Sequence, residues 1–183
     1  MARRLREEFD AMAMPHVAAL LRTATRLCGD RAAAEDLVQD TCLQAWRSFH
    51  RFTPGTNCRA WLYKILMFSH SRVRRDRARR PLVTDLDAAH ESALLFDPVT
   101  PDALTAASVK AAFETLPDQF RDAVLLVDIE ELSYREAATV LDVPIGTVMS
   151  RLNRGRRLMR RALADTAAAY GIDVDAEGNR KQG

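Results

Sequence analysis

Apolar residues recur at three- and four-residue steps through most of the chain, which is the spacing of helices that bury one side. No stretch alternates apolar and polar residues as a half-buried strand does, so the predicted fold class is all-α. Pro15 is expected to divide the first helical stretch into a short leading helix and a longer one. The predicted helices cover residues 5–27, 31–49, 58–80, 108–116, 118–132, 133–141 and 144–164.

The helical pattern fails over residues 81–107, where prolines and scattered acids replace the apolar stripe. A chain of 183 residues suits one domain or two small ones, and this interruption favours two. We therefore predict an N-terminal helical domain over residues 1–80, an acidic linker over 81–107, a C-terminal helical domain over 108–165 and a tail over 166–183.

The strongest local signal lies between residues 133 and 161. Ser133 and Glu136 have the spacing of a capping box, which starts a helix. Residues 142–144 (Asp-Val-Pro) end that helix, because the residue before a proline is pushed out of the α region, and Pro144 then starts the next one. Two helices joined by so short a break are typical of the helix-turn-helix, which places its second helix in the DNA major groove.

The second helix of this motif has two chemically different faces. Its apolar stripe comprises Ile145, Val148, Leu152, Gly155 and Met159. Its outward side comprises Thr147, Ser150, Arg151, Arg154, Arg157 and Arg161. A basic outward face fits a helix that binds DNA. The pattern leaves open an ordinary helical hairpin with a solvated basic face.

The predicted helix over residues 58–80 is apolar and aromatic in its first half and rich in arginine in its second. Aromatic side chains beside a dense arginine run suit a surface that grips a phosphate backbone and stacks exposed bases. The alternative is an aromatic stripe that faces the core, followed by a solvated basic end.

Net charge is distributed unevenly, although the total is only +2. Residues 1–80 carry +8 and residues 81–107 carry −5, while residues 108–142 carry −5 and residues 143–165 carry +5. The positive charge of the second half therefore lies on the helix already proposed to bind DNA. The phosphate backbone of a nucleic acid binds such a surface through counterion release, whatever the base sequence.

The cysteines and histidines show no spacing that would hold a metal or form a disulfide framework. The cysteines, which we expect to be buried or half-buried thiols, are Cys28, Cys42 and Cys58. The histidines are His16, His50, His70 and His90. A nuclease or phosphatase would need clustered carboxylates or a His/Cys site, and none is visible. We therefore predict no enzyme activity, no metal and no cofactor.

No apolar run approaches the roughly 18 residues that a membrane-spanning helix needs. The charged beginning of the chain also lacks the apolar core of a signal peptide. The expected location is cytoplasmic, without membrane insertion.

Two parts of the chain resemble one protein family, the extracytoplasmic-function (ECF) sigma factors of bacterial RNA polymerase. The family's C-terminal promoter-binding domain is similar to L-P-D-Q-F-R-D-A-V-L-L-V-D-I-E-E-L-S-Y-R-E-A-A and the following V-P-I-G-T-V-M-S-R-L-N-R-G-R-R. Its N-terminal domain is similar to E-D-L-V-Q-D-T-C-L-Q-A-W and P-G-T-N-C-R-A-W-L-Y-K-I-L. The two matches occur in the family's order and cover roughly residues 15–163.

The resemblance implies a subunit that binds core RNA polymerase, recognises the −35 promoter element as duplex and melts the −10 element, in a stress response. The residues implied at the −35 element are Thr147, Met149, Ser150, Arg151, Asn153, Arg154 and Arg157, with Arg151 and Arg157 on phosphates. Those implied at the −10 element are Trp61, Lys64, Phe68, Arg72, Arg74, Arg75 and Arg77. Those implied at the polymerase are Asp36, Gln39, Asp40, Gln44 and Trp46.

The resemblance also implies partners and two departures from the family. The acidic linker resembles the segment that threads the polymerase near the RNA path, and the form T-N-C-R-A-W-L-Y-K-I-L resembles subgroups controlled by zinc-bearing anti-sigma proteins. Many relatives have asparagine at the position of Phe68 and an acid or amide at that of Arg72, which affects the expected −10 preference. Met149 replaces a frequent basic residue, so base readout there would be apolar, for example against a thymine methyl.

An autonomous helix-turn-helix repressor is the alternative from another class of DNA-binding protein. Such a protein would bind duplex DNA tightly on its own and would present a dimerisation surface. The sequence offers no separate dimerisation helix, which favours the sigma factor.

Overall fold

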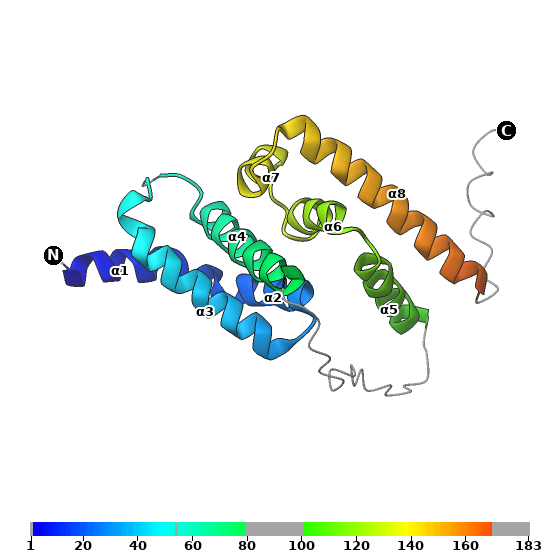
Figure 1. Cartoon of the computed structure of the whole chain (residues 1–183), viewed down its shortest axis with the longest axis horizontal. Coiled ribbons are helices and arrows are strands. Elements are labelled where there is room, and N and C mark those ends of the chain that lie inside the picture. The colour runs from blue at the N-terminus through cyan, green and yellow to red at the C-terminus, as the bar shows by residue number, and fades with distance from the viewer. Residues whose placement is uncertain (1, 54, 80–100, 170–183) are drawn as a thin grey trace. The chain divides into compact units, whose positions relative to one another are not determined.

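The computed structural model describes residues 2–53, 55–79 and 101–169, and every regular element in these ranges is helical (Figure 1). The predicted all-α fold class is confirmed for these residues. The helices form two compact units. One unit holds the described residues up to Arg79 together with residues 132–144, and the other holds residues 101–131 and 145–169. The domain boundaries derived from the sequence divide the chain differently, and they stay a prediction.

The first unit contains five α-helices and two 3₁₀ turns among the described residues. They are α1 (Ala2–Ala13), η1 (Met14–His16), α2 (Val17–Cys28), α3 (Arg31–Ser48), η2 (Phe49–Arg51), α4 (Cys58–Arg79) and α7 (Tyr134–Leu141). Pro15 lies in η1, between α1 and α2, so its predicted role as a divider is confirmed.

The turn between α2 and α3 follows from two adjacent residues. Gly29 adopts a left-handed conformation (φ 69°) and its N–H donates to the Thr25 carbonyl at 2.9 Å, which ends α2. The Asp30 carboxylate accepts a hydrogen bond from the Ala33 N–H at 2.8 Å and so caps α3. With so short a connection, α2 and α3 pack against one another.

The core of the first unit holds α4 against α2 and α3. The side chains of Leu20, Leu62, Tyr63 and Leu66 are fully buried. Burial of each such leucine stabilises the fold by roughly 1.5–3 kcal/mol. The Tyr63 hydroxyl lies 3.3 Å from the Thr23 Oγ1, so this buried phenol has a hydrogen-bond partner. This packing fixes which side of α4 faces outward.

The second unit contains α5 (Pro101–Glu114), α6 (Asp118–Val124), the π-helical turn η3 (Leu125–Ile129) and α8 (Ile145–Ala169). The long helix α8 packs along both α5 and α6 (Figure 1). Val148, Leu152 and Gly155 of α8 are buried, as the apolar stripe predicted. A Cβ atom at Gly155 would lie 2.7 Å from the Val124 Cγ2, so the glycine permits a close approach of α8 to α6.

Three features of the second unit differ from the prediction. α5 begins at Pro101 rather than at residue 108, because proline is well suited to the first position of a helix. The turn η3 interrupts the predicted helix over 118–132, and the Glu130 N–H there donates to the Leu125 carbonyl at 2.9 Å. α8 continues to Ala169, since alanine favours the helix even without an apolar stripe. Most of the predicted acidic linker and of the tail lies outside the described residues.

Candidate nucleic-acid interface

The local interactions of residues 133–144 define how α7 begins and ends. The Ser133 Oγ accepts a hydrogen bond from the Glu136 N–H at 3.2 Å, and the Glu136 Oε2 accepts one from the Ser133 N–H at 2.9 Å. This confirms the predicted capping box. Asp142 is left-handed (φ 54°), and its N–H and that of Val143 both donate to the Ala138 carbonyl. Only residues 142–144 separate α7 from α8 along the chain.

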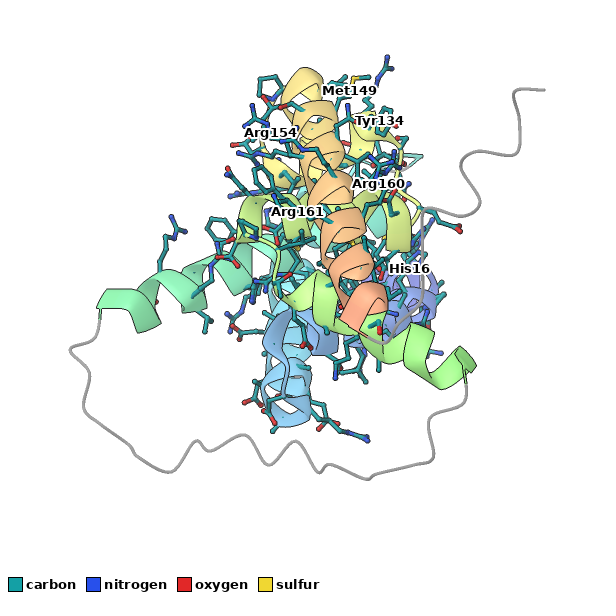
Figure 2. The ribbon with its side chains drawn as sticks, turned by 90° about the vertical axis from the view of Figure 1, so that its right-hand side faces the viewer. His16, Tyr134, Met149, Arg154, Arg160 and Arg161 are labelled. Atoms are coloured by element: carbon teal, nitrogen blue, oxygen red, sulfur yellow. The ribbon has the colours of Figure 1, made fainter. Side chains whose placement is uncertain are left out.

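The outward face of α8 carries the residues predicted to read the −35 element. Met149 is 46% exposed, while Thr147 and Arg151 are half-buried at the edges of the face. Ser150, Asn153, Arg154 and Arg157 are also exposed. Figure 2 shows Met149 and Arg160 on one side of the α8 ribbon and Arg154 and Arg161 on the other. Ile145, expected in the apolar stripe, is instead 41% exposed at the first position of α8.

Arg156 of α8 has no role predicted from the sequence, and the structure shows a partner for it. The Arg156 Nε donates to the Asp128 Oδ2 at 3.0 Å, and the Arg156 Nη2 donates to the Asp128 Oδ1. The two residues lie 28 positions apart, so no local pattern could have paired them. The other α8 arginines described here stay on the outward side of the helix or at its edge.

The residues of α4 predicted at the −10 element have different surroundings. Phe68 is 58% exposed, an unusual degree for a phenylalanine, and Lys64 is also exposed. Trp61 is half-buried in an aromatic cluster, with its ring centroid 4.9 Å from that of Phe52 and 6.4 Å from that of Phe49. Trp61 therefore also fits the alternative reading of an inward-facing aromatic stripe.

Among the arginines that follow on α4, those whose side chains the structure describes are exposed or half-buried. The Arg75 Nε donates to the Ser71 carbonyl at 3.3 Å, and Arg74 is half-buried. Arg72 lies 3.9 Å from the Asp40 carboxylate of α3. The side chain of Arg77 lies outside what the structure describes.

The predicted polymerase-binding face of α3 comprises Asp36, Gln39, Asp40, Gln44 and Trp46. Asp36, Gln39 and Asp40 are exposed, and Trp46 is 39% exposed. The Trp46 ring stands edge-on to that of Phe9, with 5.3 Å between centroids. The Gln44 Nε2 donates to the Ser69 Oγ at 3.0 Å, so two of the five residues, Asp40 and Gln44, are linked to α4.

A polar cluster joins α4 to α7 within the first unit, and sequence reasoning missed it. The Asn57 Nδ2 donates to the Glu136 Oε1 across 79 positions of the chain. Hydrogen bonds from the Ser133 side chain and backbone hold the pKa of Glu136 below its ordinary 4.5, and Asn57 and Arg59 contribute. The Arg59 guanidinium also lies 5.5 Å above the Tyr63 ring. The pKa of His16 lies below 6.5, mainly because the side chain is partly buried. The positive charge of Arg59 lowers it further.

Within the described residues no group of three or more His, Cys, Asp or Glu side chains could hold a metal ion. None of the three cysteines forms a disulfide, and burial raises the pKa of Cys42 and of Cys58. In the same part of the chain, no helix has the length and apolar character that crossing a membrane requires.

Two family models match this chain in order. Residues 12–80 match the model of Sigma-70 region 2, and residues 106–159 match that of Sigma-70 region 4. The −10 and polymerase residues predicted from the sequence fall within the first match, and the −35 residues fall within the second.

Curated relatives and solved structures agree with these matches. The chain is 38% identical over 159 residues to the ECF RNA polymerase sigma factor SigE of Mycolicibacterium smegmatis, a match that covers 85% of this chain and 62% of the relative. It is 36% identical to the ECF RNA polymerase sigma factor EcfG of Rhodopseudomonas palustris, with 86% of each chain covered. The fold is similar to the sigma factor RpoE in complex with the anti-sigma factor NepR from Bartonella quintana, at a TM-score of 0.70 and 31% identity, covering 86% of this chain and 97% of that one. It is also similar to CnrH in complex with the cytosolic domain of CnrY, at a TM-score of 0.64 and 26% identity, covering 87% and 90%.

Proposed function

The chain belongs to the ECF sigma factors of RNA polymerase, and from that premise we propose which of its surfaces performs each step of promoter recognition. Such proteins are not enzymes, and they direct RNA polymerase to promoters. We assign −35 recognition to the outward face of α8, −10 melting to α4 and polymerase binding to α3. The observation that carries this assignment is the occurrence of regions 2 and 4 in order, with five of the seven implied −35 residues exposed on one helix.

At the −35 element, Ser150, Asn153 and Arg154 offer donors and acceptors to base edges, and Met149 offers an apolar contact to a thymine methyl. Arg157 lies on the same exposed face, and Arg151 lies at its edge. These two guanidiniums contact phosphates, which set the register of the helix on the duplex. Thr147 contributes at the N-terminal end of α8.

At the −10 element, the exposed Phe68 stacks on a base of the separated strand while Lys64, Arg72, Arg74, Arg75 and Arg77 contact its backbone. The half-buried Trp61 supports this surface from the aromatic cluster and exposes part of its ring for stacking. Polymerase binding uses the acidic edge of Asp36 and Asp40 with Gln39, Gln44 and the exposed part of Trp46.

The regulatory partner that we propose is an anti-sigma protein. A solved structure similar in fold to this chain is the sigma factor RpoE in complex with the anti-sigma factor NepR, and another is CnrH in complex with the cytosolic domain of CnrY. The zinc-bearing class of anti-sigma protein stays a prediction. The proposed place of action is the cytoplasm, at the nucleoid, in a stress response.

Two substitutions test the assignment of surfaces. Arg154→Ala is expected to weaken binding of the polymerase complex to promoter duplex by about tenfold, the size expected for one base contact. The affinity of the chain for core polymerase is expected to stay unchanged. Asp40→Ala is expected to weaken association with core polymerase instead. Arg22→Ala, which removes an exposed arginine of α2, serves as the control for both. Wild-type binding and transcription by both variants would refute the assignment.

A further inference from the structure

The pair formed by Asp128 and Arg156 has a geometry that fixes direction as well as distance. Two parallel hydrogen bonds join the guanidinium to the carboxylate, one of them 3.0 Å long. Such a fork holds both planar groups in one orientation, which a single ion contact does not do. The side chains are 44% and 29% exposed, so the pair lies at the rim of the second unit rather than in its core.

The neighbouring residue of α8 fixes the helix in a different way. Gly155 lies so close to α6 that a Cβ atom there would be 2.7 Å from the Val124 Cγ2 and 3.3 Å from the Phe120 carbonyl oxygen. This contact sets how near the two helices lie. Apolar packing is not directional, so it leaves some freedom for α8 to rotate about its axis. The fork at Arg156 restrains that rotation.

Arg156 is placed where its restraint reaches the DNA-binding face. It follows Met149 by seven residues, about two helical turns, and therefore lies on nearly the same line along α8. It follows Asn153 by three residues and lies beside it. A rotation of α8 by about 20° would displace side chains at its surface by roughly 2 Å, given its radius. That displacement is enough to lose a hydrogen bond to a base edge.

We propose that Asp128 and Arg156 are positioning residues for −35 recognition, which fix the rotation of α8 and so select the bases that Met149 and Asn153 meet. The inference rests on the proposed role of α8 at the −35 element. It assigns to Arg156 a task different from that of Arg151 and Arg157, whose guanidiniums contact phosphates. Asp128, on η3, has no proposed contact with DNA and acts through Arg156 alone.

The test measures sequence preference rather than total activity. Full-length chain and core polymerase are assayed for transcription from a library with a constant −10 element and a randomised −35 element. Asp128→Asn keeps the size of the side chain but removes its charge and one acceptor. The preference for the best −35 sequences over the average is expected to fall by about tenfold, as for one lost base contact. Asp128→Glu, which keeps both oxygens, is expected to restore most of this preference.

A control separates positioning from general stability. Glu114→Gln removes another ion pair of the second unit, the exposed contact with Lys110 at 3.8 Å, and is expected to leave the −35 preference unchanged. If Asp128→Asn lowers transcription from every library member by one common factor, the pair is merely structural and the inference is wrong. If Asp128→Asn leaves the −35 preference unchanged, the inference is also wrong.

A direct phosphate contact by Arg156 would give a third result that also overturns the inference. Asp128→Asn would then strengthen binding to all sequences, and Arg156→Met would weaken it uniformly and lower the salt dependence by about one phosphate contact. Arg154→Ala is assayed in parallel. If wild type and Arg154→Ala both lack any −35 preference, the proposed function fails, whereas a wild-type preference retained by Asp128→Asn refutes only the positioning role.

Discussion

Asn57 connects the starts of two helices through Glu136, although the two residues lie 79 positions apart in the chain. The Asn57 Oδ1 accepts a hydrogen bond from the Ala60 N–H at 3.2 Å and so caps α4. Its Nδ2 donates to Glu136, which at the same time closes the capping box of α7 with Ser133. One amide therefore satisfies polar groups at both helix starts within the first unit.

Asn57→Ala is expected to lower the free energy of unfolding by about 1–2 kcal/mol, because it removes a helix cap and a hydrogen bond to a carboxylate. Asn57→Ser keeps a capping oxygen but cannot reach Glu136, so its free energy of unfolding is expected to fall less than that of Asn57→Ala. Urea denaturation of the three proteins measures both effects. Equal stability of the alanine variant and wild type would contradict the described role of Asn57.

The stability of the chain should depend on the ionisation of Glu136. Hydrogen bonds from Ser133 favour the carboxylate and lower its folded pKa below 4.5, so the stabilisation is fully present above pH 4.5. It is lost as the pH falls through the folded pKa. Glu136→Gln is expected to reduce stability at neutral pH and to flatten this acid dependence. Denaturation curves recorded from neutral pH down to below pH 4.5 measure this acid dependence. Parallel stability profiles for the variant and wild type would contradict the role of the Glu136 carboxylate.

Glu131→Gly is expected to stabilise the fold by about 1 kcal/mol, since a left-handed backbone is costly for a residue with a Cβ atom. Glu131 has φ of 53° and an exposed side chain, so glycine removes strain and little packing. Glu131→Ala keeps the Cβ atom and serves as the control. Thermal denaturation compares the three, and a glycine variant no more stable than the alanine variant would refute the account of strain.

Gly155→Ala is expected to destabilise the second unit by about 1–3 kcal/mol, the usual cost of overpacking. The added methyl group would meet the Val124 Cγ2 at 2.7 Å and the Phe120 carbonyl oxygen at 3.3 Å. Gly146→Ala is the matched control on the same helix, because no atom lies within 4 Å of its added Cβ. That control is expected to be neutral or slightly stabilising, since alanine favours helices. Equal effects of the two substitutions in urea denaturation would contradict the close approach.

The helices themselves could be predicted from the sequence because their ends depend on neighbouring residues. Gly29 and Asp30 end one helix and cap the next, and Ser133 with Glu136 starts α7 as their spacing predicts. The early start of α5 at Pro101 does not follow from the apolar stripe, whereas proline fits the first position of a helix.

The interactions between helices could be predicted only in part. Periodicity shows that Gly155 is buried, but it does not identify Val124 as its neighbour. The Asp128–Arg156 and Asn57–Glu136 pairs join residues distant in the chain, for which a single sequence carries no signal. Trp61 shows the same limit, since its aromatic neighbours come from a turn that the pattern did not relate to α4.

Run-off transcription with purified core RNA polymerase, the full-length chain and a promoter library tests the central claim most directly. The account predicts that adding the chain starts RNA synthesis at a subset of promoters that share −35 and −10 elements, and that Arg154→Ala reduces initiation there while Arg22→Ala does not. If the wild-type chain starts transcription at no promoter in the library, or if it binds its target duplex equally well without polymerase and never recruits it, the account is contradicted.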